Sequence, residues 1–125
     1  MLTDDPQALL PLTPAIFQIL LALAGGERHG YSIMQEIVVN TEGKMKVGPG
    51  MLYGSLKRML TLELIEVSDE RPDSTLDNER RIYYRLTLFG RLVAQAEAER
   101  LLKIVQIAQA RHLVRRSEAG GSAAC

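Results

Sequence analysis

The segment from Val47 to Ile65 constrains the fold of this 125-residue chain more than any other. Its apolar residues recur at steps of three and four, which predicts one buried stripe of a helix: Leu52, Leu56, Met59 and Leu60. Pro49 suits the first helical turn, where its missing N–H would have no partner anyway. The opposite side carries small groups, a hydroxyl and two cations, and so has room to approach another surface: Met51, Gly54, Ser55, Lys57 and Arg58.

A two-stranded hairpin is expected to follow this helix. Residues 64–68 are a short apolar strand candidate, and residues 69–80 form a polar stretch that we interpret as a long hairpin loop. In residues 81–86, Ile82, Tyr84 and Leu86 alternate with polar neighbours, which predicts a strand with one wet face. Helix, strand, charged hairpin and returning strand is the order of a winged helix, a module that docks on DNA.

Two shorter helices are predicted upstream. Thr13 and Pro14 are a cap and a first-turn proline, and Gly25-Gly26 would end this first helix with a left-handed cap. A second helix follows His29-Gly30 and stops near residues 40–43, and its expected buried side consists of apolar residues: Tyr31, Met34, Ile37 and Val38. Residues 44–47 would be a connector, with one rung of strand.

The longest predicted element is a helix over residues 88–114, begun by Thr87 and free of proline. A helix of this length spans roughly 40 Å, whereas a domain of this size has a radius of gyration of roughly 14 Å. Its apolar residues fall on two lines, with Leu102 and Ile104 nearby: Leu88 and Leu92; Ala94, Ala98, Leu101, Val105 and Ala108. The far half therefore needs a partner, and a second copy giving a symmetric dimer is the simplest one.

The fold class that follows is mainly α with a small β-hairpin wing. We expect a loosely held arm over residues 1–11, a winged-helix domain over 12–87, a dimerisation helix over 88–114 and a disordered tail over 115–125. Aromatic residues are only 5% of the chain and Trp is absent, so the core must be aliphatic, which favours helices.

The composition of the chain narrows the classes of function that are compatible with it. The chain has 15 basic and 15 acidic residues, so any DNA binding must come from local clusters of charge. The lone Cys125 offers neither a disulfide nor a metal site, and no acid–base pair, phosphate loop or activated nucleophile indicates an enzyme or a cofactor. With no leader and no apolar run of about 20 residues, we expect a cytoplasmic protein that does not enter the membrane.

The candidate DNA contacts combine exposed backbone at a helix start, a phenol and local cations. They are Lys44, Lys46, Gly48, Pro49, Gly50, Met51, Tyr53, Gly54, Lys57, Arg80 and Arg81. The competing interpretation is that Lys57 belongs to a solvated helix face and that Tyr53 is a half-buried core residue. Since a ring can pack while its hydroxyl reaches outward, both readings of Tyr53 stay open.

From about Leu12 to Leu113 the chain resembles the PadR-like transcriptional regulators, because several short motifs occur in the same order and with the same spacing. They are Leu-Thr-Pro at 12–14, His-Gly-Tyr at 29–31, Pro-Gly-Met-Leu-Tyr at 49–53, Leu-Lys-Arg-Met at 56–59, Leu-Ile at 64–65 and Tyr-Tyr-Arg-Leu-Thr at 83–87. The resemblance, to the shorter subclass with a single C-terminal helix, implies a homodimeric winged-helix repressor of a pseudo-palindromic operator on double-stranded DNA. It also implies release by a small hydrophobic effector at or near the dimer interface.

Three features depart from the family pattern. Gly48 stands where the family often has Ser or Thr, and Gly54 where it commonly has Pro. The loss of a hydroxyl at position 48 removes a helix cap and a phosphate donor. The wing is also acidic, with five carboxylates around its three arginines: Asp69, Glu70, Asp73, Asp77 and Glu79 around Arg71, Arg80 and Arg81.

An effector pocket or dimer seam would have walls from the first and last helices: Phe17, Gln18, Leu21, Leu92, Ala96, Glu99, Leu102 and Lys103. A packed, dry dimer seam explains the same residues equally well. A different function also fits the zero net charge: a winged-helix module that binds a protein through its acidic wing instead of DNA.

Overall fold

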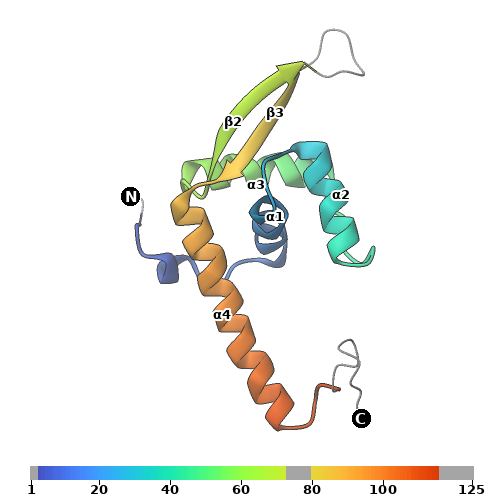
Figure 1. The fold of residues 1–125 in the computed structure, drawn as a ribbon, viewed down its shortest axis with the longest axis vertical. Coiled ribbons are helices and arrows are strands. Elements are labelled where there is room, and N and C mark those ends of the chain that lie inside the picture. The colour runs from blue at the N-terminus through green and yellow to red at the C-terminus, as the bar shows by residue number, and fades with distance from the viewer. Residues whose placement is uncertain (1–2, 73–79, 116–125) are drawn as a thin grey trace.

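The computed structural model describes residues 3–72 and 80–115, and has the predicted winged-helix architecture (Figure 1). Its elements are η1 (Pro6–Leu9), α1 (Pro14–Ala24), β1 (Arg28–His29), α2 (Gly30–Asn40), α3 (Pro49–Thr61), β2 (Ile65–Pro72), β3 (Arg80–Leu86) and α4 (Leu88–Ala110). The β2–β3 hairpin projects at one end of the molecule and the last turns of α4 at the other. Among the described residues, no helix is both long and apolar enough to cross a membrane.

Side-chain caps set the starts of the helices largely as predicted. The Thr13 hydroxyl accepts the Ile16 N–H at 3.2 Å, and the Thr87 hydroxyl accepts the Gly90 N–H at 2.9 Å. Gly48 precedes α3 without any side-chain cap, as its missing hydroxyl requires. A left-handed cap was predicted at Gly25-Gly26 after α1. Gly25 instead stays right-handed at φ −82°, and Gly26 is the residue with a positive φ, at 141°.

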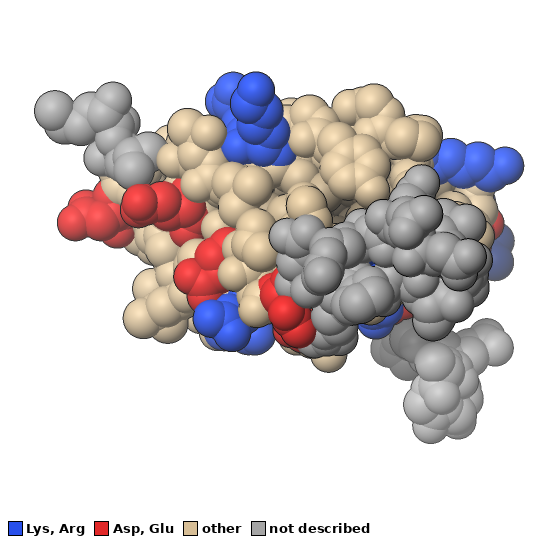
Figure 2. All heavy atoms as spheres, turned by 90° about the horizontal axis from the view of Figure 1, so that it is seen from above, with Lys and Arg blue, Asp and Glu red and all other residues tan. Residues whose placement is uncertain are grey.

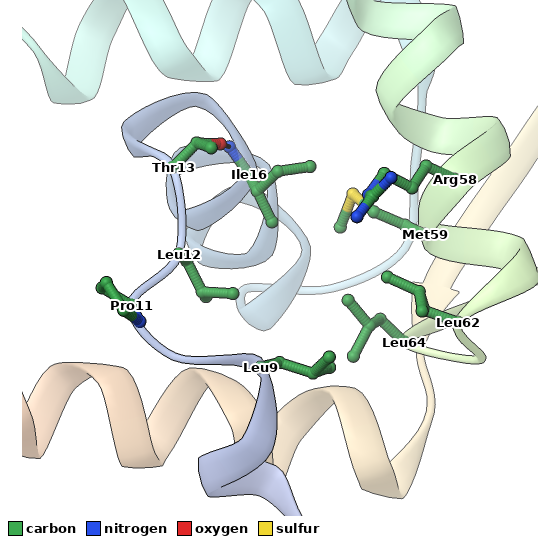
Figure 3. A pocket seen from close by; sticks show the side chains of 9 residues that line it. All are labelled: Leu9, Pro11, Leu12, Thr13, Ile16, Arg58, Met59, Leu62 and Leu64. Carbon is green, nitrogen blue, oxygen red and sulfur yellow. Dashed lines mark hydrogen bonds between the residues drawn. The ribbon is translucent and has the colours of Figure 1, made fainter. Parts of the chain in front are cut away.

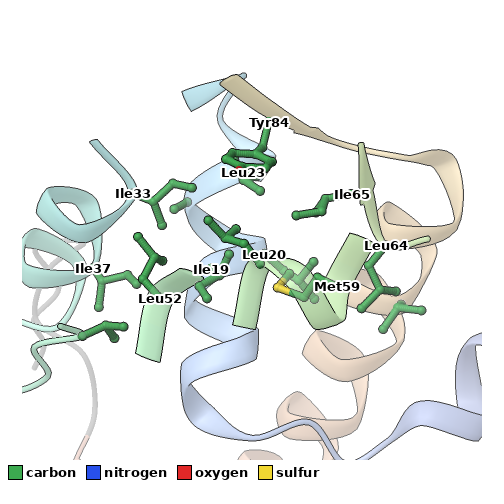
Figure 4. Packing of buried hydrophobic residues seen from close by; sticks show 14 residues of the cluster. Ile19, Leu20, Leu23, Ile33, Ile37, Leu52, Met59, Leu64, Ile65 and Tyr84 are labelled. Carbon is green, nitrogen blue, oxygen red and sulfur yellow. The ribbon is translucent and has the colours of Figure 1, made fainter. Parts of the chain in front are cut away.

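The core is aliphatic and is built around α1 (Figure 4). Its fully buried side chains come from the four α-helices, from the turn before β2 and from the first residue of β2: Ile19, Leu20, Leu23, Ile33, Ile37, Leu52, Leu56, Met59, Leu64, Ile65 and Val93. Tyr84 closes the core from the sheet and is buried, as its alternation predicted. The stripe predicted for the third helix is confirmed, because three of its four residues are buried and Leu60 packs against the cluster.

The buried face of α2 differs from the prediction. Tyr31 is 56% exposed and Val38 36% exposed, whereas Ile33 is fully buried. Gly30, Ile33 and Ile37 follow steps of three and four on one side, and Tyr31 lies about 100° further around the helix. Ile37 is buried and Met34 packs against the core as predicted, so the prediction is wrong only for Tyr31 and Val38.

The sheet is antiparallel in the order β1–β3–β2. One rung of strand was predicted for residues 44–47, but these residues form no strand. The third strand is β1, in which Arg28 pairs with Tyr84 and His29 with Tyr83. Between the pairs Val67–Tyr84 and Asp69–Tyr83 the register shifts by one residue at Ser68, which is a β-bulge.

The wing strands are longer than predicted. Residues 69–72, which we interpreted as loop, continue β2 as far as Pro72, because ladder hydrogen bonds need no apolar side chain. Ile82 is 42% exposed and not in the core, since the hairpin extends beyond the helices. Residues 73–79, with three of the predicted wing carboxylates, lie outside the described part of the chain.

The long helix α4 ends four residues before the predicted limit, and His112 takes a left-handed φ of 63° just after it. Its first half packs on the core mainly through Val93, Ala96 and Glu97, and Ala94 is the residue of the two predicted apolar lines that packs against the core cluster. Its second half exposes Leu102, Ile104, Val105 and Ile107. The prediction that this helix overshoots the domain is confirmed (Figure 1).

The segment before α1 is not the loose arm that its two prolines indicated. Residues 6–9 form the short helix η1, and Leu9, Leu10 and Leu12 pack against the core. The Leu12 N–H donates to the Glu97 carboxylate at 3.0 Å, which joins this segment to α4.

Candidate functional site

The outward face of α3 is fixed by its buried face. Because Leu52, Leu56 and Met59 are at most 1% exposed, the residues between them must face solvent. The exposed residues at the start and on the outward side of α3 are Gly48, Pro49, Gly50, Met51, Tyr53, Gly54 and Lys57. All seven were predicted as DNA contacts, and the structure brings them together on one continuous surface.

The backbone is unusually accessible on this face. A methyl group built on Gly48, Gly50 or Gly54 would meet nothing within 4 Å. The first N–H groups of a helix have no intrahelical acceptor, and Gly48 supplies no cap to satisfy them. The N–H groups of Gly50 and Met51 can therefore donate to an anion that approaches along the helix axis.

Tyr53 combines the two roles that its sequence position left open. It is 51% exposed, yet its ring and hydroxyl lie against Gly30, where any side chain would collide with them. Burial, and then the nearby Tyr53, raise the pKa of Tyr84, so the Tyr84 phenol stays neutral at physiological pH. Tyr53 thus braces the start of α2 while part of its ring faces solvent.

The wing contributes Arg81, which is held by β1. Its Nη1 lies 2.7 Å from His29 Nε2, and the His29 ring meets the Tyr83 ring edge-on at a centroid distance of 5.2 Å. Arg80 begins β3 next to Arg81, but its side chain lies outside the described part.

The remaining predicted cations lie on the α2–α3 connector. Lys44 and Lys46 are exposed there, before the start of α3. Figure 2, seen from above the wing, shows basic side chains in separate groups rather than in one stripe, with acidic groups between them. The positive electrostatic potential of this surface is therefore confined to separate patches, as expected for a chain with equal numbers of basic and acidic residues.

Two structural residues escaped the sequence reasoning. Arg28 donates through Nε to the Ala22 carbonyl at 3.0 Å and through Nη1 to Ser32 at 2.9 Å, and pairs with Glu36 at 3.3 Å. Glu97 is buried in α4 and bonded to Arg100 three residues later. The i, i+3 spacing of Glu97 and Arg100 was the available signal, since such pairs face each other on a helix.

The predicted effector residues do not share one pocket. Ala96, Glu99 and Lys103 line a hollow of about 300 Å³ beside η1, together with Gln7, Arg100 and Ile104. Phe17 and Gln18 are half-buried on α1 and Leu21 is 39% exposed, but none of the three lines this hollow. Leu92 and Leu102 are exposed on α4. Within the described residues, Gln18 Oε1 is buried without a hydrogen-bond partner.

The described residues hold no group of three His, Cys, Asp or Glu side chains placed to bind a metal ion. A comparison with protein families matches residues 19–96 to the transcriptional regulator PadR-like family. The chain belongs to this family. The match runs from the middle of α1 to the buried part of α4 and includes the whole outward face of α3.

Solved structures similar to this PadR-like chain share its fold. A PadR-like transcriptional regulator from Bacillus cereus superposes with a TM-score of 0.63 at 20% identity, over 90% of this chain and 100% of the other. A PadR family regulator from Clostridium difficile has a TM-score of 0.63 at 23% identity, over 78% and 96%. Bacillus subtilis PadR, solved in complex with operator DNA, has a TM-score of 0.59 at 22% identity, over 73% of this chain and 47% of the other.

One curated relative is much longer than this chain and is itself uncharacterized. An uncharacterized 37.1 kDa protein in a Streptomyces fradiae transposon is 30% identical over 104 residues. That match covers 83% of this chain but only 25% of the relative. The PadR-like chain thus spans about a quarter of the curated relative that it matches.

Proposed function

We propose that this PadR-like regulator binds double-stranded DNA sequence-specifically, with α3 in the major groove of each half of a pseudo-palindromic operator. The observation that carries the proposal is the outward face of α3, which presents accessible glycine backbone, a tyrosine and a lysine. The opposite face of this helix is fully buried, and its burial determines which side of α3 faces solvent. The first-turn N–H groups and Lys57 would contact phosphates, while Met51 would reach base edges. The Bacillus subtilis relative was solved with operator DNA, which supports this docking.

We further propose that the active form is a homodimer joined through the second half of α4. This part of the helix exposes Leu102, Ile104, Val105 and Ile107, and a second copy would bury them in a symmetric interface. Two copies of α3 would then read half-sites about 34 Å apart, or a multiple of that. Repression is the mode that we propose, because a dimer seated on a promoter blocks access by the polymerase.

An effector that binds between α1 and α4 at the dimer seam would release the operator. The candidate walls are the predicted residues on these two helices, and the unpaired Gln18 Oε1 supplies a polar group that a ligand or the partner copy could satisfy. The effector hypothesis fails if no small hydrophobic molecule changes either operator affinity or the melting temperature of the dimer.

The test is binding to the DNA upstream of the gene itself and of its neighbours, measured across a salt series. We expect tight binding to one sequence, with an affinity that falls steeply as salt rises. The second candidate function, a protein-interaction module, is favoured by the zero net charge and the separated basic groups. Weak binding that is blind to sequence, together with a specific partner in a pull-down, would support the module instead.

A further inference from the structure

An open groove lies where the end of α3, the start of β2 and the first turn of α4 meet, and it encloses about 560 Å³. Its lining includes four apolar side chains and two glutamates: Leu60, Val67, Leu88 and Phe89, with Glu63 and Glu66. Figure 3 shows another hollow at the same turn, lined by Leu62 and Leu64, which shares no lining residue with the groove. The groove is therefore a separate surface at the base of the wing.

The apolar part of this groove is continuous with the proposed dimer seam. Leu88 is 75% exposed and Val67 is 51% exposed, although both belong to regular elements beside the core. Leu88, Leu92 and Leu102 are all exposed and lie within about 80° of one another around α4. The apolar stripe that a second copy would cover in the far half of the helix thus leads back to the groove.

The charge of the groove is negative. Glu63 is exposed, and within the described residues its carboxylate makes neither a hydrogen bond nor an ion pair. Glu66 is already paired with Arg85 at 2.7 Å, so Glu63 supplies the charge that remains to be matched. An occupant that fits this surface has apolar side chains next to a cation.

The chain carries such a segment directly after α4, at residues 112–115. Leu113 is 78% exposed and Val114 42% exposed, and the exposed Arg115 makes no ion pair with any described residue. In its own copy this segment is separated from Leu88 by the length of α4, roughly 33 Å. A second copy is therefore the natural source of the segment.

The geometry of a symmetric seam brings the partner's segment to the groove. A two-fold axis across α4 makes the two helices antiparallel. If they cross at the exposed Leu102, then Leu88 of one copy lies about 21 Å from the crossing, opposite position 116 of the other. Residues 112–115 of the partner then lie beside the start of α4.

We propose that residues 112–115 of each copy occupy the groove of its partner, with Leu113 and Val114 on the apolar lining and Arg115 paired with Glu63. The proposal rests on the homodimer proposed above and adds its second contact. Because the groove is built from the end of α3 and the base of the wing, each copy would help to hold the DNA-reading elements of the other. Dimerisation and operator binding would thereby be coupled.

A charge-reversal cycle on the full chain tests the pairing. Glu63→Arg should raise the dimer dissociation constant about tenfold, because two symmetric ion pairs are lost and each is worth a factor of about three. Adding Arg115→Glu should restore the affinity to within about twofold of wild type. Analytical ultracentrifugation measures all three proteins. Glu42→Arg, which reverses another exposed carboxylate at a similar positive φ, is the matched control. Failure of Arg115→Glu to rescue the dimer would overturn the pairing.

Disulfide trapping tests the contact itself. Cys125 is the only cysteine, so Cys125→Ser leaves a background for Glu63→Cys with Arg115→Cys. A bridge needs Cα atoms within about 7 Å, so mild oxidation should join position 63 of one copy to position 115 of the other. Glu42→Cys with Arg115→Cys should stay unlinked. Bridges only between the two copies of position 115, or equal linking at position 42, would overturn the inference.

The two measurements separate this inference from the proposals on which it rests. A wild-type chain that stays monomeric would overturn the homodimer and the segment together. A stable dimer with neither the charge effect nor the bridge would overturn the segment alone. DNA enters neither measurement, so the docking of α3 is tested independently.

Discussion

Glu97, buried in the middle of α4, accepts the backbone N–H of Leu12 at 3.0 Å, across 85 residues of sequence. The same carboxylate accepts two bonds from Arg100, at 2.5 and 3.0 Å. A buried carboxylate is tolerated only when its oxygens are satisfied, and here both are. This one side chain therefore fixes the entry to α1 against the long helix.

The first prediction concerns the stability of this link. Glu97→Ala leaves the Leu12 N–H buried without an acceptor and should lower the free energy of unfolding by about 2 kcal/mol. Glu97→Gln keeps one oxygen for Leu12 and Arg100 Nη2 but loses the charge and the bond from Arg100 Nε, so its loss should be smaller. Urea denaturation measures both, with exposed Glu99→Gln as the control. Equal losses in the Ala and Gln variants would show that the Leu12 bond contributes nothing.

A pH dependence follows from the same group. The hydrogen bonds from Arg100 hold the pKa of Glu97 below its ordinary value of 4.5, the Leu12 N–H adds to this, and burial only partly opposes them. Because the folded state has the lower pKa, the ionised carboxylate stabilises the fold above the unfolded pKa and ceases to do so as pH falls through the folded one. The stability difference between wild type and Glu97→Gln should thus be constant near neutral pH and shrink below about pH 4.5. Denaturation curves from pH 7 to pH 3 measure this difference, and a gap that widens toward acid would contradict the assignment.

Three glycines should respond differently to alanine. At Gly90 a methyl group would run into the Leu64 backbone, so Gly90→Ala should cost about 2 to 3 kcal/mol of stability. At Gly30 it would meet the Tyr53 ring, so the cost should disappear when Tyr53→Ala is added. At Gly54 it would meet nothing, so Gly54→Ala should stabilise the helix by about 1 kcal/mol. Thermal unfolding of these four variants, with Tyr53→Ala alone as the reference for the double variant, measures this order. A stable Gly90→Ala protein would mean that α4 can shift away from β2.

The sequence was sufficient for the order of the four α-helices and the β2–β3 hairpin, and for the orientation of α3. The steps between Leu52, Leu56 and Met59 and the caps at Thr13 and Thr87 are local signals, and local signals determine where helices begin and which side they bury. The resemblance added the family but no side-chain geometry.

The features that escaped prediction all depend on contacts between distant segments. Tyr31 was assigned to the core because nothing local reveals that the small Gly30 lies on the buried side against Tyr53. The rung at Arg28 and His29 is a strand only because β3 lies beside it. The hydrogen bond between Glu97 and Leu12 joins two ends of the domain. The apolar pattern of a helix does not predict which distant segment one of its polar side chains will contact.

Lys57 tests whether α3 contacts DNA. It is exposed on the outward face, so Lys57→Ala should weaken operator binding roughly five- to tenfold at about 0.1 M salt and shallow the salt slope by about one unit per protomer. The loss should be the same for all sequences, since a lysine on a phosphate reads no base. Arg111→Ala, at the end of α4 away from the wing, is the control for total charge. A slope that stays unchanged in Lys57→Ala removes this residue from the contacts.

The dimer prediction must respect where α4 becomes part of the core. Cutting the chain after Gly90 would remove the buried Val93 and Glu97, so the loss of a dimer in that variant would only report unfolding. The sharper change is Leu102→Glu with Val105→Glu, because both side chains are more than 40% exposed in the single chain and lie one helical turn apart. Charges there should cost the monomer nothing but prevent burial in a symmetric seam, so light scattering should find folded monomers with weak operator binding. Gln106→Glu, which adds charge at a polar position, should remain dimeric. A tight dimer of the double variant would mean that the copies meet elsewhere, and the apolar far half of α4 would then need another partner.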